Sequence, residues 1–328
     1  MYLMKKRPRR TRKNQSIRNL VAETALPDAS QLIYPVFIQE GRNYAQEIAS
    51  MPGQFRMSVD TLLQRMATWK KLGINNYALF PNIDDKLKNA KSTEALNANG
   101  FLYQAIKKIK DRYPEVNIFA DVALDPFNSD GHDGLVENGE IVNDKTIEVL
   151  SRMSVLSAQA GADFVCPSDM MDGRIGKIRK ALEAEGLINT GIVAYSAKYA
   201  SSFYGPFRDA LDSAPRAGDK KTYQMDFRNS REAIKEIELD IQEGADIVMV
   251  KPALSYLDII SQAKRHFKYP IAAYNVSGEY AMVKAAGKNG WLDETKAMIE
   301  ILTSIKRAGA DIIFTYHAVD YAKLRDEQ

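Results

Sequence analysis

The chain has 328 residues, of which 45% are hydrophobic and 27% charged, and its formal net charge is +3. This composition is ordinary for a globular protein with a sizeable core, and it excludes disordered and fibrous classes. No apolar run approaches the roughly 18 residues that cross a bilayer, because the richest one, Ile247 to Val250, ends at Lys251. The single cysteine, Cys166, excludes an intrachain disulfide and a cysteine-based zinc cluster. We therefore expect a cytoplasmic protein with no membrane partner.

The N-terminal segment is strongly basic, since residues 1–18 contain eight lysines and arginines and no acidic residue. Such a segment could bind nucleic acid or direct the chain to an organelle. It lacks the apolar stretch of a secretory signal and the interleaved aromatic residues of a nucleic-acid surface. We predict that residues 1–31 form an N-terminal arm that is solvated or embraces another subunit, with no nucleic-acid partner. An organelle-targeting role of the basic residues is the alternative.

From about residue 32 onward, short β-rich apolar runs alternate with longer amphipathic stretches, which is the pattern of βα units and a parallel sheet. At roughly 150 residues per domain the length allows two domains, but an α/β barrel forms one larger unit. Eight such runs are present, the number of strands that closes a (β/α)₈ barrel. We predict an α/β fold, a TIM barrel over residues 32–328 with an N-terminal extension arm. The eight expected strands are Leu32–Gln39, Tyr77–Pro81, Asn117–Asp125, Asp163–Ser168, Gly191–Ser196, Ile247–Pro252, Pro270–Val276 and Ile312–His317.

A weak internal repeat accompanies these runs. Glycine ends a predicted helix directly before a strand at four positions, Gly73, Gly161, Gly244 and Gly309. Glycine suits the left-handed conformation in which a helix stops and turns into the sheet. The same connection is common in any α/β protein, so the repeat alone does not separate a barrel from an open sheet.

One long stretch within the barrel region, residues 208–226, has the pattern of neither helix nor strand. It is rich in Pro, Gly, Ser and charged residues, and it follows the fifth predicted strand. Segments after barrel strands lie over the active face, where long ones often act as covers. We predict a lid over about 208–226.

The most informative residues are two lysines. Lys251 ends one predicted strand, and Lys198 lies just past the preceding one, so both ammonium groups should meet at the carboxyl-end mouth of the barrel. Burying a lysine is costly unless it is used or paired. Two neighbouring, partly desolvated cations favour each other's neutral form, and a neutral amine attacks a ketone to give a Schiff base. The pair therefore indicates amine catalysis by Lys198 and Lys251.

Five longer motifs resemble the porphobilinogen synthase family, also called the δ-aminolaevulinic acid dehydratases. The resemblance extends from about Tyr34 to the C-terminus and implies a TIM barrel that condenses two molecules of δ-aminolaevulinic acid, with loss of two waters, to porphobilinogen for tetrapyrrole synthesis. It implies Schiff bases on both lysines, on Lys251 with the substrate that becomes the propionate side and on Lys198 with the other. The motifs are MVKPALSYLD around Lys251, YSAKYASSFYGPFRDA around Lys198, TYQMD from Thr222, VSGEYAM from Val276 and PSDMMDGRI from Pro167.

The resemblance also implies how the substrates are held. Arg208, Lys220 and Gln224 on or beside the lid would hold one carboxylate, as arginine can do in bidentate fashion. The family often has arginine where Lys220 stands, so this contact is a point charge here. Ser277 and Tyr316, both at strand ends, would bind the other carboxylate through their hydroxyls.

The sequence departs from the zinc-dependent branch of the family. Ala123, Asp125 and Asp133 occupy the places of three cysteines, and His132 alone does not make a zinc site. Carboxylates suit hard cations such as magnesium, act as acid or base groups, or pair with a substrate ammonium. Similarity to the aspartate-rich branch predicts a zinc-independent site. It also places three side chains near the substrate amine, those of Asp121, Asp133 and Ser168.

Glu236, on the helix before Lys251, matches a glutamate that holds a largely hydrated magnesium ion in many family members. Residues matching Asp169 and Arg174 support that ion, which activates by stabilising an octamer. The resemblance thus implies magnesium as an activating cofactor, no organic cofactor and assembly into a homo-octamer. The helix is acidic throughout, so its composition alone does not establish the site.

Two other functions compete with this one. A class I aldolase acting on a sugar phosphate would also use a Schiff base, but it needs a phosphate-binding glycine loop, whereas Ser277-Gly278 is followed by Glu279. A barrel that has lost catalysis and serves as a scaffold would be expected to lack a lysine or the lid cations, and none is missing.

Overall fold

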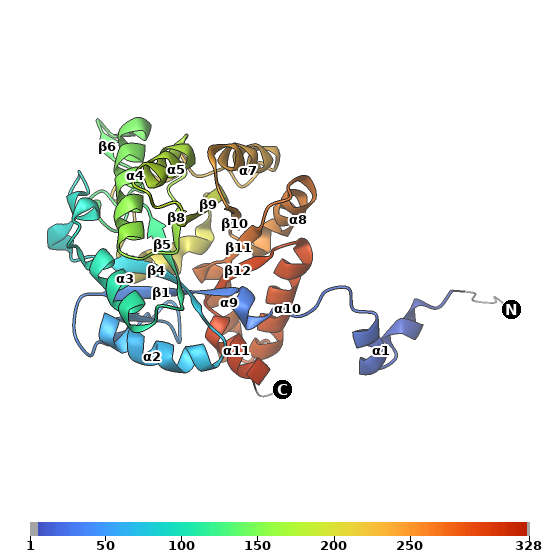
Figure 1. Ribbon diagram of the computed structural model, residues 1–328. Helices are drawn as coiled ribbons and strands as arrows, with labels where there is room; N and C mark the ends of the chain where they lie inside the picture. Colours follow the sequence, from blue (N-terminus) through green and yellow to red (C-terminus); the bar gives the residue numbers. More distant parts are fainter. Residues whose placement is uncertain (1–5, 327–328) are drawn as a thin grey trace.

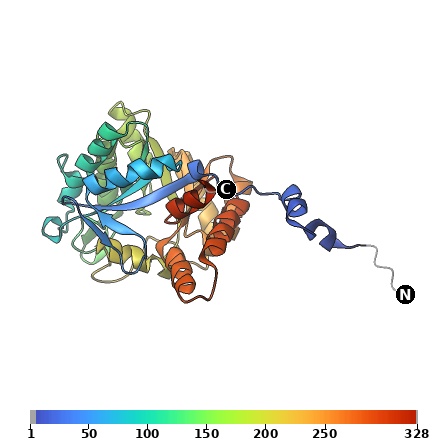
Figure 2. The same ribbon diagram turned by 90° about the horizontal axis from the view of Figure 1, so that it is seen from below.

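The computed structural model describes residues 6–326 and contains a closed barrel of eight parallel strands surrounded by helices (Figures 1 and 2). The barrel closes where β12 pairs with β1, in the register Leu32 to Ile313 and Ile33 to Phe314. The predicted TIM barrel is confirmed, and all eight expected strands are present with ends shifted by a few residues at most. The barrel strands, in order, are β1 (Leu32–Gln39), β4 (Asn76–Asn82), β5 (Asn117–Val122), β8 (Phe164–Pro167), β9 (Gly191–Lys198), β10 (Ile247–Lys251), β11 (Ile271–Asn275) and β12 (Ile312–Thr315).

Two apolar layers hold the barrel together. Alternate residues of a strand point to opposite faces, so in β1 Tyr34 and Val36 pack outward under the helices while Ile33 and Phe37 fill the interior. The interior is a packed core of aromatic and branched side chains, which leaves the carboxyl-end mouth for other use. The helices that follow the barrel strands are α2 (Val59–Lys71), α3 (Phe101–Arg112), α4 (Asn143–Gln159), α5 (Arg174–Ala184), α6 (Gly205–Leu211), α7 (Arg231–Glu243), α8 (Leu257–His266), α9 (Ser277–Lys288), α10 (Glu294–Ala308) and α11 (Ala318–Asp326).

The four glycines of the repeat all have positive φ, as a helix-to-strand turn requires. The φ angles are 107° at Gly244, which ends α7, and 126° at Gly309, which ends α10. A side chain at Gly309 would also come within 2.6 Å of Lys264, so this turn needs glycine for two reasons.

Short elements escaped the sequence patterns. A hairpin of β2 (Ala45–Glu47) and β3 (Phe55–Met57) extends the barrel sheet from β1, and β6 (Val136–Glu137) pairs with β7 (Glu140–Ile141). Strands of two or three residues are too short to show alternation. The predicted lid begins inside α6, so its first residues are helical. Asp212 then ends the helix in the left-handed conformation, with φ 47°.

The N-terminal arm projects away from the barrel in both views (Figures 1 and 2). It contains a 3₁₀ turn, η1 (Pro8–Arg12), and the short helix α1 (Gln15–Leu20), and neither has a buried residue. Leu20 is 84% exposed. The turn η2 (Ala29–Gln31), held by a capping box, leads into β1. Among the described residues, none of the helices has the length and apolarity to cross a membrane.

Candidate active site

The two lysines predicted to act together end adjacent strands. Lys198 is the last residue of β9 and Lys251 the last of β10, and the two pair directly in the sheet register. Both side chains are buried at the carboxyl-end mouth. The strand-end placement follows from the sequence pattern, because parallel neighbours end at the same edge of the barrel.

Aromatic rings surround the Lys251 ammonium. Its Nζ lies between 4.3 Å (Tyr274) and 5.4 Å (Tyr204) from the centroids of four rings, the other two being those of Tyr195 and Phe207. Burial lowers the pKa of Lys251 to about 7, and the neighbouring Lys198 acts in the same direction. A large share of Lys251 is therefore a neutral amine at neutral pH, the form that attacks a ketone.

Lys198 has a different environment, because it is ion-paired. Its Nζ lies 2.9 Å from Asp133 Oδ2 and also donates to the carbonyl oxygen of Ser168. The other oxygen of Asp133 accepts a hydrogen bond from Lys220, which belongs to the segment 208–226 and lies 3.6 Å from Asp125. Burial alone would raise the pKa of Asp133, but Lys198 and Lys220 hold it well below its usual range. Asp133 is thus an anion shared by two buried cations.

Asp121 is the second buried carboxylate of the site. Its Oδ1 accepts a hydrogen bond of 2.8 Å from the Ser168 hydroxyl. Burial, with a contribution from Asp125, raises the pKa of Asp121 to about 7. Asp121 can therefore take up or release a proton near neutral pH, which suits an acid or base group.

The predicted carboxylate-binding residues line the same cavity. Arg208 makes no ion pair within residues 6–326, and the side-chain oxygen of Gln224 is buried without a partner. The Ser277 hydroxyl accepts from Phe207 N at 3.0 Å, and Tyr316 contacts the Tyr274 hydroxyl at 3.1 Å. The structure thus brings together every predicted catalytic and substrate-binding residue, those being Lys198, Lys251, Arg208, Lys220, Gln224, Ser277, Tyr316, Asp121, Asp133 and Ser168.

Glu279 supports this site in a way that the sequence did not reveal. It is 1% exposed and accepts hydrogen bonds from Leu254 N, Val276 N and the Asn275 side chain, at 2.8 to 3.0 Å. Asn275 in turn accepts from Thr315. The network joins the carboxyl ends of β10, β11 and β12. Lys251 ends β10, Ser277 lies just after β11, and Tyr316 follows β12 directly. In the sequence, Glu279 is only an acidic residue in the first turn of a helix, because its partners come from other segments.

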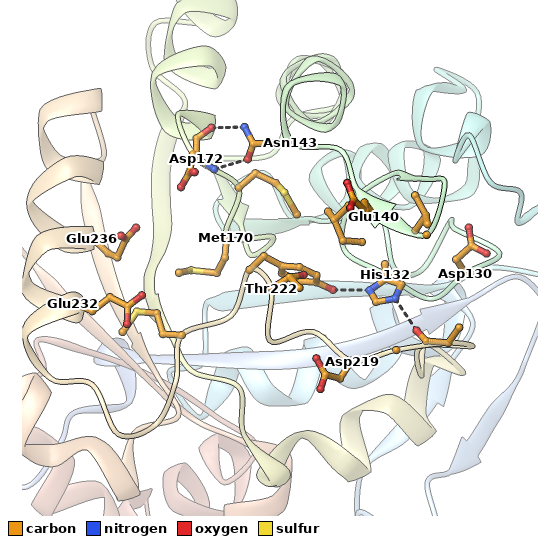
Figure 3. Close-up of a pocket in the computed structure, with 18 residues that line it drawn as sticks. Asp130, His132, Glu140, Asn143, Met170, Asp172, Asp219, Thr222, Glu232 and Glu236 are labelled. Carbon is orange, nitrogen blue, oxygen red and sulfur yellow. Dashed lines mark hydrogen bonds between the residues drawn. The ribbon is translucent and has the colours of Figure 1, made fainter.

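The predicted magnesium residues lie elsewhere. Glu236 lines a second cavity of about 910 Å³ together with Asp172 and Glu232 (Figure 3). The residues expected to support it are buried beside it: Arg174 forms a bidentate pair with Asp240 at 3.1 and 3.2 Å and lies 3.6 Å from Asp169. Neither Asp169 nor Arg174 lines the cavity. Burial, with the nearby Asp240, raises the pKa of Glu236.

The pKa of Lys251 gives a testable pH dependence. Trapping of a ketone substrate on Lys251 by borohydride should increase with pH around a midpoint near 7, because only the neutral amine attacks. Lys198→Met removes the neighbouring cation and should raise the midpoint by roughly one pH unit. Peptide mass spectrometry of the trapped adduct across pH measures it. Lys284→Met, at an ion-paired lysine on α9, is the control. An unchanged midpoint in Lys198→Met would contradict the assignment.

A closed barrel with two buried, register-paired lysines at its carboxyl-end mouth belongs to the class of TIM-barrel enzymes equipped for amine catalysis. Comparison with known proteins is more specific. The sequence profile described as "Delta-aminolevulinic acid dehydratase" matches residues 5–324. The chain therefore belongs to the delta-aminolevulinic acid dehydratase family, the porphobilinogen synthases, and the expected hydro-lyase activity in tetrapyrrole biosynthesis is confirmed.

Individual relatives agree with this membership. The delta-aminolevulinic acid dehydratase of Bradyrhizobium diazoefficiens is 51% identical over 323 residues, which are 98% of this chain and 91% of the relative. The Synechococcus elongatus enzyme is 50% identical, over 97% of this chain and 98% of its own length. The crystal structure of the Toxoplasma gondii enzyme with its product porphobilinogen has a TM-score of 0.95 and 51% identity, over 98% of this chain and 92% of that one. The aldolase and scaffold alternatives are thereby set aside.

Proposed function

We propose that the chain joins two molecules of δ-aminolaevulinic acid through Schiff bases on Lys251 and Lys198. In each case a neutral lysine amine attacks the substrate ketone, and loss of one water leaves an imine. The observation that carries this proposal is the direct pairing of Lys198 with Lys251 at the buried mouth of the barrel. Lys251 would hold the substrate that becomes the propionate side, and Lys198 the substrate that becomes the acetate side.

The lid and the strand ends would hold the two carboxylates. The Arg208 guanidinium, which makes no ion pair with the residues that the structure describes, would bind one of them together with Lys220 and the Gln224 amide. The hydroxyls of Ser277 and Tyr316 would bind the other after exchanging their present hydrogen bonds. Because an imine forms by losing water, a closed lid over this cavity also favours the reaction.

The buried carboxylates would handle protons and the substrate amine. Asp121, with a pKa of about 7, would exchange protons during dehydration, and the Ser168 hydroxyl orients it. Asp133 would release Lys198 for imine formation and pair with the substrate ammonium. This assignment rests on position and charge within one cavity.

The aspartate-rich segment is proposed to work without zinc. Ala123, Asp125 and Asp133 offer no thiolate. The Lys220 ammonium already pairs with the two carboxylates, those of Asp125 and Asp133. A resident metal at that position would meet this positive charge. We propose that the lysine itself supplies the cation there, and that no organic cofactor is needed.

Magnesium is proposed at Glu236 as an activator. The cavity beside it has carboxylates and no lysine or arginine among its lining residues, which suits a cation that keeps most of its waters. Within the described residues no three acidic, histidine or cysteine side chains converge as a metal cage. Glu236, with Asp169 and Arg174 behind it, would therefore hold a largely hydrated ion that favours the assembled, active form.

The proposed assembly is a homo-octamer, in which residues 1–31 act as an arm and residues 32–328 as the catalytic barrel with its lid over about 208–226. The arm has no buried residue in its helix and carries the exposed Leu20, which a second copy would cover. We propose a cytoplasmic location. The relative from Glycine max is chloroplastic by name, so an organelle is the alternative.

The metal dependence can be tested on the purified protein. Colorimetric porphobilinogen production from δ-aminolaevulinic acid should survive exhaustive chelation, respond little to zinc and increase when magnesium is added. Glu236→Gln should lose most of the magnesium response, and the magnesium-dependent increase in particle size by sedimentation should be lost with it. Glu238→Gln, on the exposed face of the same helix, is the control. No product under any metal condition would refute the proposed reaction.

A further inference from the structure

The lid packs against the catalytic cavity and supplies three of its lining residues, Arg208, Lys220 and Gln224. The free volume of about 30 Å³ there has room for only a few water molecules, so two substrate molecules cannot be held in this conformation. Lid residues line two different cavities. Lys220 and Gln224 line the cavity of the two lysines, whereas Asp219, Thr222 and Tyr223 line the second cavity, the one that Glu236 also lines. Figure 3 shows this second side, with His132 against the lid. What holds the lid closed therefore controls access to the catalytic lysines.

His132 makes two hydrogen bonds to the lid (Figure 3). Its Nε2 lies 3.0 Å from the carbonyl oxygen of Ala217, and its Nδ1 lies 3.1 Å from the Tyr223 hydroxyl. A carbonyl oxygen only accepts, so Nε2 carries the proton, and in the neutral ring Nδ1 accepts from Tyr223. Both ring nitrogens of this buried histidine are thus used within the protein, which leaves neither for a metal.

Tyr223 extends this chain of hydrogen bonds to the catalytic cavity. While its hydroxyl donates to His132, it also accepts from the backbone N–H of Asp133 at 3.3 Å. Asp133 is the carboxylate that pairs with both Lys198 and Lys220. The Tyr223 hydroxyl therefore lies between the lid and the main chain that positions this carboxylate.

Neighbouring contacts fix the same junction. Arg216 N donates to Asp130 O at 3.0 Å. Gly131 lies so close to the lid that a side chain there would come within 2.3 Å of the Ala214 carbonyl oxygen. The segment 130–133 after β5 is thus the surface on which the lid rests, and His132 supplies its side-chain hydrogen bonds to Ala217 and Tyr223.

We propose that His132 and Tyr223 are positioning residues that form a latch: together they hold the lid closed and keep Asp133 in place against Lys198. The latch acts through its hydrogen bonds and does not touch the reacting atoms. The role in catalysis rests on the proposed function of Lys198, whereas the role in lid closure does not.

The test uses the full-length, substrate-free protein with Tyr223→Phe, which removes only the hydroxyl. Limited trypsin digestion should cut after the exposed Arg216 and Lys221 roughly three- to tenfold faster than in the wild type, the range that loss of one hydrogen bond supplies. Cleavage in the exposed arm, at Arg9 to Lys13, should not change. His132→Phe should give the same result, because it removes the same hydrogen bond from the other partner. It replaces Tyr223→Phe in the test if that variant folds poorly.

The matched control is Tyr77→Phe, which removes another buried tyrosine hydroxyl. That hydroxyl donates to Ile74 O between the barrel and its outer helices, away from the lid. In a product assay, Tyr223→Phe should raise KM by a similar factor and change kcat less, while Tyr77→Phe should change neither. Wild-type cleavage rates in Tyr223→Phe, or equal acceleration in Tyr77→Phe, would overturn the latch. If even the wild type makes no product, the proposed function fails, but the cleavage ratio still decides the latch.

Discussion

Replacing Lys251 with methionine is expected to abolish porphobilinogen formation, with a loss in kcat on the order of 10⁴-fold or more, as for other covalent nucleophiles. Lys251 supplies the buried amine with a pKa near 7, and no other lysine has that environment among residues 6–326. Methionine has a similar length and no charge to desolvate, so the barrel should stay folded. Product assay, with mass spectrometry after borohydride trapping, measures both the rate and the missing adduct.

Lys284→Met gives the reference for this experiment. That lysine is half-buried and paired with Glu294 and Asp320 on the outer side of the barrel, so its loss should leave the adduct on Lys251 intact. Normal turnover by Lys251→Met would refute the assignment of Lys251 as a Schiff-base residue.

Asp133→Asn should destabilise the fold by about 3–5 kcal/mol, because it leaves two buried ammonium groups without their shared anion. The free energy of unfolding in urea, at one fixed protein concentration, measures the effect. Removing one orphaned cation as well should recover part of the loss, so Asp133→Asn with Lys220→Met should be more stable than Asp133→Asn alone.

An exposed pair supplies the control for this prediction. Glu137 and Lys145 form an ion pair of 2.8 Å on the surface, where solvent screens both charges. Glu137→Gln should change the free energy of unfolding by less than about 1 kcal/mol. Equal losses in Asp133→Asn and Glu137→Gln would show that Asp133 does not neutralise buried charge.

The barrel and its lysine pair were predictable because both depend on local patterns. Apolar strands separated by amphipathic stretches indicate the parallel sheet, and a lysine at each of two neighbouring strand ends places both at one mouth. The four positive-φ glycines agree with the expected turns. Motif resemblance added the substrate and the expected carboxylate-binding roles of Arg208, Lys220 and Gln224, which no periodicity indicates.

The rest of the site depends on contacts between distant segments. Lys220 meets Asp133 across 87 residues, and Tyr195, Tyr204 and Tyr274 come together around Lys251 only when the strands close and the segment after β9 folds back. His132, taken as a lone imidazole in the sequence, acquires its role from Ala217 and Tyr223. Hydrogen-bond partners of this kind leave no pattern in the sequence because the fold alone decides which side chains meet.

The pairing of β12 with β1 also governs how the chain can be made. Nearly the whole chain separates Leu32 from its partner Ile313, and β3 pairs only with Phe37 and Ile38 on that edge, so during synthesis the start of β1 stays unpaired there until β12 has left the ribosome. At about 5–20 residues per second that interval lasts on the order of half a minute. Throughout it the nascent chain exposes free backbone donors and acceptors along an apolar strand, the kind of edge that invites aggregation. Production of this enzyme should therefore benefit from chaperones that cover the nascent strand, and slower translation should make aggregation worse.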